Sequence, residues 1–361
     1  MIWKPKEKDL TLEEAVEMAR KELAPFWFGK SPQIAGVYAN GNYSVFPLNP
    51  DFSKDPWLIL IIDPTQYSGE GAILYAKEWH KRYSELGLNF LLLVTATYKY
   101  LMKVELAQKF VEDLQADLTV AIDVEQALAP AFGVKIPPKI ILIHQNKKYL
   151  EFNEGDWVEQ TEILIQKFLR IKEPGLPLSA IYQTKQKMVF DVLRVEFGTK
   201  PKLGTSFQFP EGIFREVPDS PGIQKGNFET SRVPGDILHE EELFVTGKWT
   251  RDAEKLSTSD PNATITFYAT GGMVAMVAES LSTSSDHPIV IVEAGGLPLF
   301  ESMAGQDITM DETGKSVVWV RKPGLYHLVN NATIKHRTIT LRFGNVDVAP
   351  IGIFGLRIGQ W

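Results

Sequence analysis

Apolar residues follow two different periods along the chain, one before about residue 172 and another after residue 243. The runs 57–62 and 90–94 are continuously apolar, which is typical of parallel strands that are buried on both faces. Between them apolar residues recur at spacings of four and three, which predicts one buried face of a crossover helix. That face comprises Ala72, Ala76, Trp79, Tyr83 and Leu86. A strand–helix–strand unit is therefore expected here.

The same reasoning extends this pattern over residues 1–172. Thr11 can cap a helix because Glu14 completes a capping box. Asn40-Gly41 favours a two-residue hairpin turn. Asp156 is a good cap for a last helix that buries Leu164, Ile165, Phe168 and Leu169. The remaining predicted elements are helices over 11–24, 104–115 and 126–132, and strands over 34–38, 43–46, 119–122, 140–144 and 149–152. This order predicts an α/β domain.

The second half of the chain has a different character. Residues 173–242 contain several prolines and glycines and few periodic runs, so we interpret them as an extended connector. From residue 243 the period becomes two, as in 265–269 and 338–343. Further strands fit 273–278, 289–292, 317–321, 326–329 and 352–358. Many short strands separated by turn residues predict an antiparallel sandwich or jelly roll over residues 243–361.

Length and charge narrow the classes of function. A chain of 361 residues exceeds the usual size of one core, which agrees with two domains. The net charge of −7 and the lack of a Lys/Arg cluster argue against nucleic acid and anionic membranes as partners. The longest clean apolar run, 57–62, is too short for membrane insertion. The charged start predicts a cytoplasmic protein if Met1 is the native start, and an extracytoplasmic one if the chain is a truncated form.

Catalytic signatures are scarce. The chain has no cysteine, which excludes thiol-disulfide chemistry. It also lacks G-x-S-x-G, the P-loop, G-x-G-x-x-G and H-E-x-x-H, and its six histidines show no close metal-ligand spacing. We therefore expect no cofactor and no metal. A Ser/His/Asp site assembled from distant residues stays open at this level.

Three segments of the first half resemble one family. The stretch Asp63-Pro64-Thr65-Gln66-Tyr67-Ser68-Gly69-Glu70-Gly71-Ala72 is similar to the active-site turn of DipZ-type thiol-disulfide proteins, in which Tyr-Ser precedes Cys-x-x-Cys. In this register Gly69 and Ala72 stand at the two cysteine positions. Residues 95–98 and 152–157 resemble the Thr-Pro-Glu-Tyr and Phe-Gly-Glu-Gly-Asp-Tyr segments of the same family, and 199–204 is a weaker likeness to its connector.

The resemblance implies a thioredoxin-like domain followed by an all-β module similar to carbohydrate-binding jelly rolls. It does not include the family's membrane-embedded electron-transfer part, and both redox cysteines are missing. Pro138 stands where thioredoxins place a cis-proline, although Pro137 leaves the register open by one residue and a turn-shaping proline is the alternative. If the register is right, the unaltered chain should show no disulfide reductase activity and Gly69→Cys with Ala72→Cys should introduce some. Two positions too far apart to form a disulfide would contradict the register.

Strand parity suggests a ligand surface on the predicted sandwich. Tyr268 and Arg342 fall on the faces opposite to the apolar positions of their strands, and Trp319 shares a face with Arg321. Aromatic rings flanked by polar groups suit sugar rings. The alternative is that these rings only cover the edge of a sheet. Trp249 alternates with apolar residues and is interpreted as core.

These patterns favour a non-redox binding or scaffold protein whose partner is a glycan or another protein or peptide. Two alternatives stay open. One is an enzyme of another class that reuses the cleft near Gly69, and the other is a purely structural subunit.

Overall fold

The computed structural model divides the chain into two compact units, which are described separately below. One unit consists of residues 1–64 and 69–186, and the other of 65–68 and 187–361. None of the described helices is long and apolar enough to span a membrane. The residues described are 37–39, 42–44, 54–95, 97–98, 100, 118–123, 132, 134, 137–145, 147–153, 157–182, 190–198, 207–208, 226–230, 243–269, 271–331 and 337–360.

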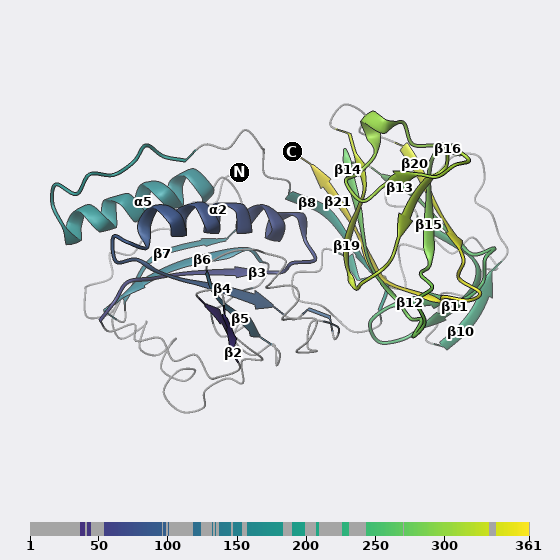
Figure 1. Cartoon of the computed structure of the whole chain (residues 1–361), viewed down its shortest axis with the longest axis horizontal. Coiled ribbons are helices and arrows are strands. Elements are labelled where there is room, and N and C mark those ends of the chain that lie inside the picture. The colour runs from purple at the N-terminus through teal and green to yellow at the C-terminus, as the bar shows by residue number, and fades with distance from the viewer. Residues whose placement is uncertain are drawn as a thin grey trace. The chain divides into compact units, whose positions relative to one another are not determined.

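The first unit contains a seven-stranded sheet in the order β2-β1-β5-β4-β3-β6-β7 (Figure 1). Strands β3, β4 and β5 are parallel, whereas β6 and β7 are antiparallel to their neighbours. The strands are β1 (Val37–Ala39), β2 (Asn42–Ser44), β3 (Trp57–Ile62), β4 (Asn89–Thr95), β5 (Thr119–Asp123), β6 (Lys139–His144) and β7 (Lys147–Asn153). The runs at 57–62 and 90–94 are confirmed as buried central strands, and the predicted pairs at residues 34–46 and 140–152 are confirmed as antiparallel.

Two helices cover one face of this sheet, α2 (Tyr67–Tyr83) and α5 (Trp157–Lys172) (Figure 1). The predicted buried face of α2 is confirmed, because Ala72, Ala76, Trp79 and Tyr83 are all buried. On α5, Ile165, Phe168 and Leu169 are buried and Leu164 is half-buried. The order of strands and helices makes this unit a thioredoxin-like fold, as expected. The predicted helices over 11–24 and 104–115 lie outside the described residues, as does all but the last residue of 126–132.

The second unit contains fourteen described strands linked in one continuous pairing path. Because β11 (Leu243–Arg251) pairs in two sheets, the path forms two sheets with a common core. All pairs except β8 with β9 are antiparallel. The strands are β8 (Phe190–Glu196), β9 (Phe207–Gln208), β10 (Gly226–Thr230), β11 (Leu243–Arg251), β12 (Leu256–Thr258), β13 (Thr264–Ala269), β14 (Met273–Ser280), β15 (Ile289–Ala294), β16 (Leu297–Pro298), β17 (Thr309–Met310), β18 (Ser316–Trp319), β19 (Gly324–Asn330), β20 (Arg337–Gly344) and β21 (Ile351–Gln360). A short 3-10 helix, η2 (Glu301–Met303), follows β16.

One apolar core lies between the two sheets. Alternate residues of β13 and β20 belong to this core, including Phe267, Leu341 and Phe343. Trp249 of β11 also belongs to it, as the sequence predicts. Strand β11 belongs to both sheets, because residues 243–246 pair with β13 and residues 247–251 pair with β10. The all-β domain expected from the period of two is therefore a sandwich with a shared strand.

The segment predicted to be a connector contains strands of this sandwich. β8 pairs along the second half of β21, and β10 pairs with β11. Phe197, which follows β8, is fully buried in the sandwich core. The structure thus differs from the connector prediction at these strands, because β8 pairs with the C-terminal strand β21, a partner that no local sequence pattern reveals.

Candidate functional sites

The turn that resembles a redox site leads into the first turn of α2. Gly69 lies so close to the preceding strand that an added Cβ atom would stand 2.0 Å from the carbonyl oxygen of Asp63 and 2.9 Å from its carbonyl carbon. Ala72, one turn later, is fully buried. A side chain at position 69, a cysteine included, would therefore force the backbone to shift, because contacts this short are not tolerated.

The prolines before β6 lie at a position the sequence singled out. The peptide bond between Pro137 and Pro138 is cis, which agrees with the cis-proline interpretation of Pro138 rather than with an ordinary turn. Both prolines are buried. Lys139 follows directly and begins β6.

Buried polar residues gather where the parallel strands of the first unit end. Asp63 follows β3, Thr95 ends β4 and Asp123 ends β5 opposite Thr95. The antiparallel β6 begins at the same edge with Lys139, opposite Ile61. Asp63 and Asp123 are each only 1% exposed, and Lys139 is 2% exposed. Charges removed from water in this way require close partners.

Hydrogen bonds fix this polar edge. Thr97 Oγ1 donates to Asp63 Oδ2 at 2.9 Å, and Thr95 Oγ1 donates to the Ile62 carbonyl at 3.0 Å. Lys139 Nζ donates to the Phe132 carbonyl at 2.7 Å. The sequence reasoning missed these residues, although polar residues that directly follow apolar strand runs are a usable signal, because ligands of open α/β sheets bind at the carboxyl ends of parallel strands. No group of three His, Asp or Glu side chains within the described ranges is placed to hold a metal ion.

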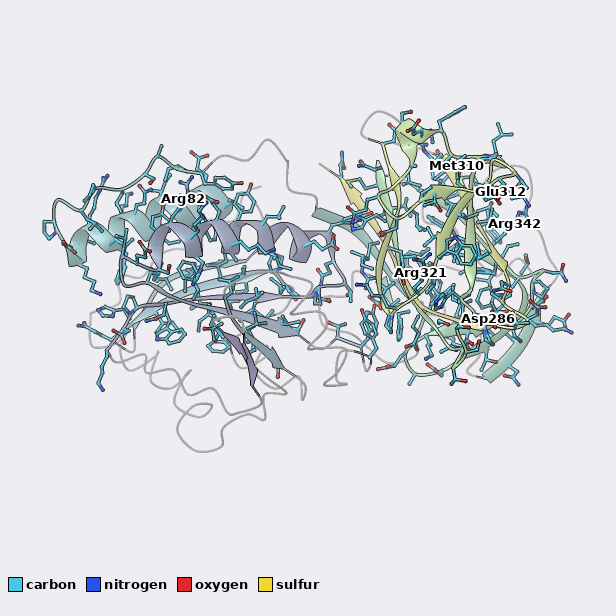
Figure 2. The ribbon with its side chains drawn as sticks, viewed as in Figure 1. Arg82, Asp286, Met310, Glu312, Arg321 and Arg342 are labelled. Carbon is cyan, nitrogen blue, oxygen red and sulfur yellow. The ribbon has the colours of Figure 1, made fainter. Side chains whose placement is uncertain are left out.

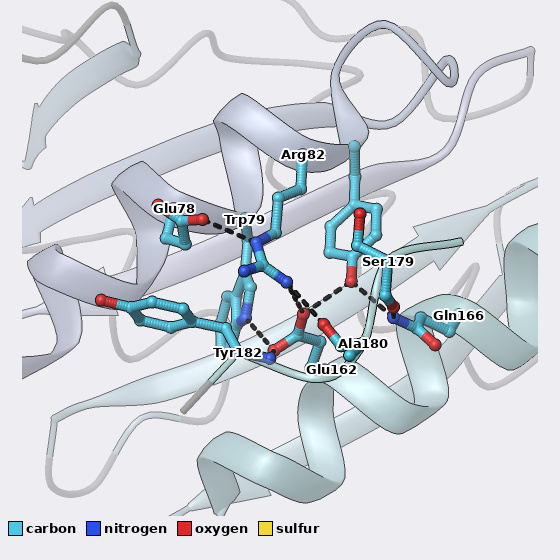
Figure 3. Close-up of polar contacts among 9 residues, drawn as sticks. Glu78, Trp79, Arg82, Glu162, Gln166, Ser179, Ala180 and Tyr182 are labelled. Carbon is cyan, nitrogen blue, oxygen red and sulfur yellow. Dashed lines mark hydrogen bonds and ion pairs between the residues drawn. The ribbon is translucent and has the colours of Figure 1, made fainter. Parts of the chain in front are cut away.

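A second polar cluster joins α2, α5 and the segment that follows α5 (Figure 3). At its centre Glu162, on α5, is fully buried. Its carboxylate accepts hydrogen bonds from Trp79 Nε1 at 3.2 Å and Tyr83 Oη at 2.6 Å, and from Arg82 at 3.4 Å. A fourth donor is the backbone N–H of Tyr182, at 2.8 Å. These residues, with Gln166, are called the Glu162 cluster below.

The largest pKa shift in this cluster is that of Tyr83. Burial and the hydrogen bond to the Glu162 carboxylate raise the pKa of Tyr83 to about 12. Arg82 also donates to Glu78, one helical turn earlier, at 2.6 Å, and this bond raises the pKa of Arg82. Both groups therefore keep their protons throughout the neutral range.

On the sandwich, the three predicted ligand residues point away from the core. Their strands lie side by side in the order β18-β15-β20-β13, and core residues such as Val318, Val292 and Phe267 occupy the alternate positions. We call the opposite side the outer face. It carries Ile289, Ile291 and Glu293 on β15, Trp319 on β18, Thr340 and Arg342 on β20, and Thr266 and Tyr268 on β13.

The strand register separates the two aromatic residues. Trp319 lies opposite Ile289, which lies opposite Gly344, whereas Tyr268 lies opposite Thr338. Tyr268 and Trp319 are thus three strands apart and offset by six residues (344 − 338), which corresponds to about 14 Å across and about 20 Å along the strands. Arg342 lies between them, so the predicted residues share a face but do not form one compact pocket.

The exposure of these residues differs. Trp319 exposes 42% of its surface, Arg342 is exposed (Figure 2) and Tyr268 is half-buried. Arg342 Nε forms an ion pair with Glu293 Oε2 at 3.1 Å across neighbouring strands. Next to it Thr266 and Thr340 bring their hydroxyl oxygens within 3.3 Å. The outer face thus presents two aromatic rings with a charge-neutral polar strip between them.

Comparison with solved structures gives distant likenesses. A putative thiol:disulfide interchange protein DsbE from Chlorobium tepidum is 19% identical over 39% of this chain and 96% of its own, with a TM-score of 0.30. The thioredoxin domain of a thiol-disulfide oxidoreductase from Bacteroides vulgatus is 15% identical over 39% of this chain and 99% of its own, with a TM-score of 0.28.

A third structure is a secreted disulfide oxidoreductase from Mycobacterium tuberculosis, homologous to DsbE of E. coli. It is 12% identical over 29% of this chain and 73% of its own, with a TM-score of 0.25. No curated protein matches the sequence. Residues 216–349, which include most of the sandwich, match the model of a family described as a thioredoxin like C-terminal domain.

Proposed function

We propose that the chain is a non-redox binding protein whose sandwich binds a neutral oligosaccharide along the outer face. The observation that carries this proposal is the position of Trp319, a tryptophan with 42% of its surface exposed on the same face as the Arg342–Glu293 ion pair. A flat ring stacks on the apolar C–H face of a sugar while neighbouring polar groups bond its hydroxyls.

The arrangement favours an extended ligand over a single sugar. Trp319 and Tyr268 lie too far apart for one ring to contact both, but they mark two ends of one face. The Arg342–Glu293 pair and the Thr266–Thr340 pair lie along the path between them. Because the arginine is already paired with a carboxylate, the strip has no net charge that would select an acidic sugar.

The first test is retention on neutral polysaccharides and binding of oligosaccharides of increasing length by calorimetry. We expect dissociation constants on the order of micromolar to millimolar, since stacking and a few exposed hydrogen bonds give modest affinity. Affinity should rise with chain length up to the length that reaches both rings. Trp319→Ala should abolish retention with little change in the unfolding midpoint, because the ring lies on the outer face and not in the sandwich core.

Met310→Ala is the matched control. Met310 is 49% exposed on the neighbouring β17, but it lies opposite the buried Ser316 and not opposite an outer-face residue. This variant should bind as the unaltered chain does. Retention that survives Trp319→Ala, or a broad set of neutral glycans without a single ligand, would overturn the proposal.

A further inference from the structure

We propose that the Glu162 cluster forms a recognition site for an extended polypeptide segment, and that residues 179–182 of the chain itself occupy this site. A partner protein that presents a similar segment with a tyrosine would then bind by displacing residues 179–182. The surface lies wholly within the first unit, between α2 and α5, and does not depend on the proposed glycan site (Figure 3).

Side chains of the two helices hold the backbone of this segment. Gln166 Nε2 donates to the Ser179 carbonyl at 2.8 Å, and Arg82 donates to the Ala180 carbonyl at 2.7 Å. Glu162 Oε2 accepts from the Tyr182 N–H at 2.8 Å. Three side chains thus bind three main-chain groups within four residues of irregular backbone. Main-chain recognition of this kind accepts an extended segment with little regard to its side chains.

One side chain of the segment does contribute specificity. The Tyr182 ring lies under the Arg82 guanidinium, 5.1 Å from the ring centroid, in a cation–π contact. The Tyr182 and Tyr75 rings meet edge to face, with their centroids 5.8 Å apart. Tyr75 in turn packs on Trp79 at 5.9 Å. The site therefore combines backbone hydrogen bonds with one aromatic anchor.

The helices keep the site organised when the segment leaves. Glu162 would lose the Tyr182 N–H but retain its hydrogen bonds from Trp79 and Tyr83 and its ion pair with Arg82. A buried carboxylate with three remaining donors stays compensated. Departure of the segment therefore leaves no buried charge without a partner. Ser179 and Ala180, by contrast, are exposed. Each is held by one hydrogen bond to its carbonyl oxygen, from Gln166 and Arg82 respectively.

The chemistry of the site defines its partner. The ligand needs two consecutive free carbonyls and, two residues later, an aromatic residue with a backbone N–H. Proline at that last position is excluded because it has no N–H to donate to Glu162. A polar aromatic ring such as tyrosine fits because it lies against a cation and another ring at the protein surface.

The experiment measures binding of a fluorescent peptide with the sequence of residues 176–184, Leu-Pro-Leu-Ser-Ala-Ile-Tyr-Gln-Thr. The full chain with Tyr182→Ala has lost its own anchor, so the peptide should bind it more tightly than the unaltered chain by a factor on the order of ten to a hundred, since occupation of the site in cis lowers apparent affinity. Arg82→Met added to Tyr182→Ala should remove binding, and so should a peptide with alanine in place of its tyrosine.

Leu74→Ala is the matched control, because Leu74 is an exposed residue of α2 that takes no part in the cluster. This variant should bind the peptide as weakly as the unaltered chain. If Tyr182→Ala does not fold, Tyr182→Leu carries the same expectation, because it keeps an apolar side chain on the segment but loses the ring that contacts Arg82 and Tyr75. Equal binding to the unaltered and weakened chains, or no binding to folded chains in which the segment is weakened, would overturn the proposal.

Discussion

At the scale of single residues, the most consequential groups are polar ones that the fold removes from water. Glu162 is fully buried, and its carboxylate accepts hydrogen bonds from side chains of α2 and from the segment that follows α5. Asp63, Asp123 and Lys139 are equally buried at the edge of the sheet. Such groups are sensitive to substitution because removing one partner leaves another charge without compensation.

Tyr83 gives the Glu162 cluster a pH signature. Its pKa is raised to about 12 in the folded chain, against about 10 for an unperturbed tyrosine. The folded state therefore favours the protonated phenol, so this contribution to stability is present below about pH 10 and is lost as the pH rises through about 12. Glu162→Gln should lower the pKa of Tyr83, because it removes a neighbouring negative charge.

Absorbance of tyrosinate during an alkaline titration measures this pKa. The difference between the unaltered chain and Tyr83→Phe isolates one phenol among the eleven tyrosines of the chain. The same difference is then recorded in the Glu162→Gln background. A component near pH 12 that stays in place in that background would contradict the assignment.

Gly69, in the first turn of α2, lies very close to the backbone of Asp63. Gly69→Ala should lower the free energy of unfolding by about 1–3 kcal/mol or more, because its Cβ would meet the Asp63 carbonyl oxygen at 2.0 Å. Helix propensity alone predicts the opposite sign. Urea unfolding distinguishes the two, with Gly324→Ala as control, since a Cβ at Gly324 meets nothing within 4 Å. An alanine variant as stable as the unaltered chain would restore the possibility of a cysteine at this position.

At the scale of elements, β11 connects the two sheets of the sandwich, because it pairs with strands of both. Gly247 marks the point where β11 passes from one sheet to the other, and it adopts a φ of 90°. A Cβ there would lie 2.6 Å from the Cα atom of Ala263. Both the backbone conformation and the contact require glycine.

Gly247→Ala should therefore destabilise the second unit by about 2–4 kcal/mol through strain and overpacking together. Gly314→Ala separates the two causes, because Gly314 also has a positive φ, of 78°, but an open space around its Cβ position. We expect it to cost only about 1 kcal/mol. Equal losses for the two variants in chemical denaturation would show that the contact with Ala263 contributes nothing.

At the scale of the whole molecule, the described core residues belong to two units. Among them the sandwich core runs from Val195 to Ile358 and includes Leu341, whereas β3, β4 and the helices bury apolar residues in the first unit. Each unit is thus large enough to unfold cooperatively by itself.

Calorimetry should accordingly resolve two transitions. Leu341→Ala should lower the temperature of the sandwich transition alone. The free energy of unfolding of that unit should fall by about 2–5 kcal/mol, because the change opens a cavity at a fully buried position. Lys139→Met should lower only the other transition, because it removes the buried hydrogen bond to the Phe132 carbonyl. A single transition that both variants lower to the same extent would show that the chain unfolds as one unit.

The sequence by itself determined the elements whose signal is local. The apolar runs of β3 and β4, the buried stripe of α2 and the alternation of β13 and β20 all follow from burial of one face or two, which fixes the spacing of apolar residues. The absence of a thiol and the outward positions of Tyr268, Trp319 and Arg342 likewise follow from residue type and parity.

Only the tertiary structure decided which distant residues meet. The register of four strands separates Tyr268 from Trp319, and pairing with the last strand turns residues 190–196 from expected connector into β8. Glu162 finds its donors about eighty residues earlier, on α2, and Gly69 meets a carbonyl oxygen that no pattern in its own helix reveals. Parity tells which way a side chain points, but distance across a sheet or between helices depends on contacts that are non-local in the sequence, and these set both candidate sites.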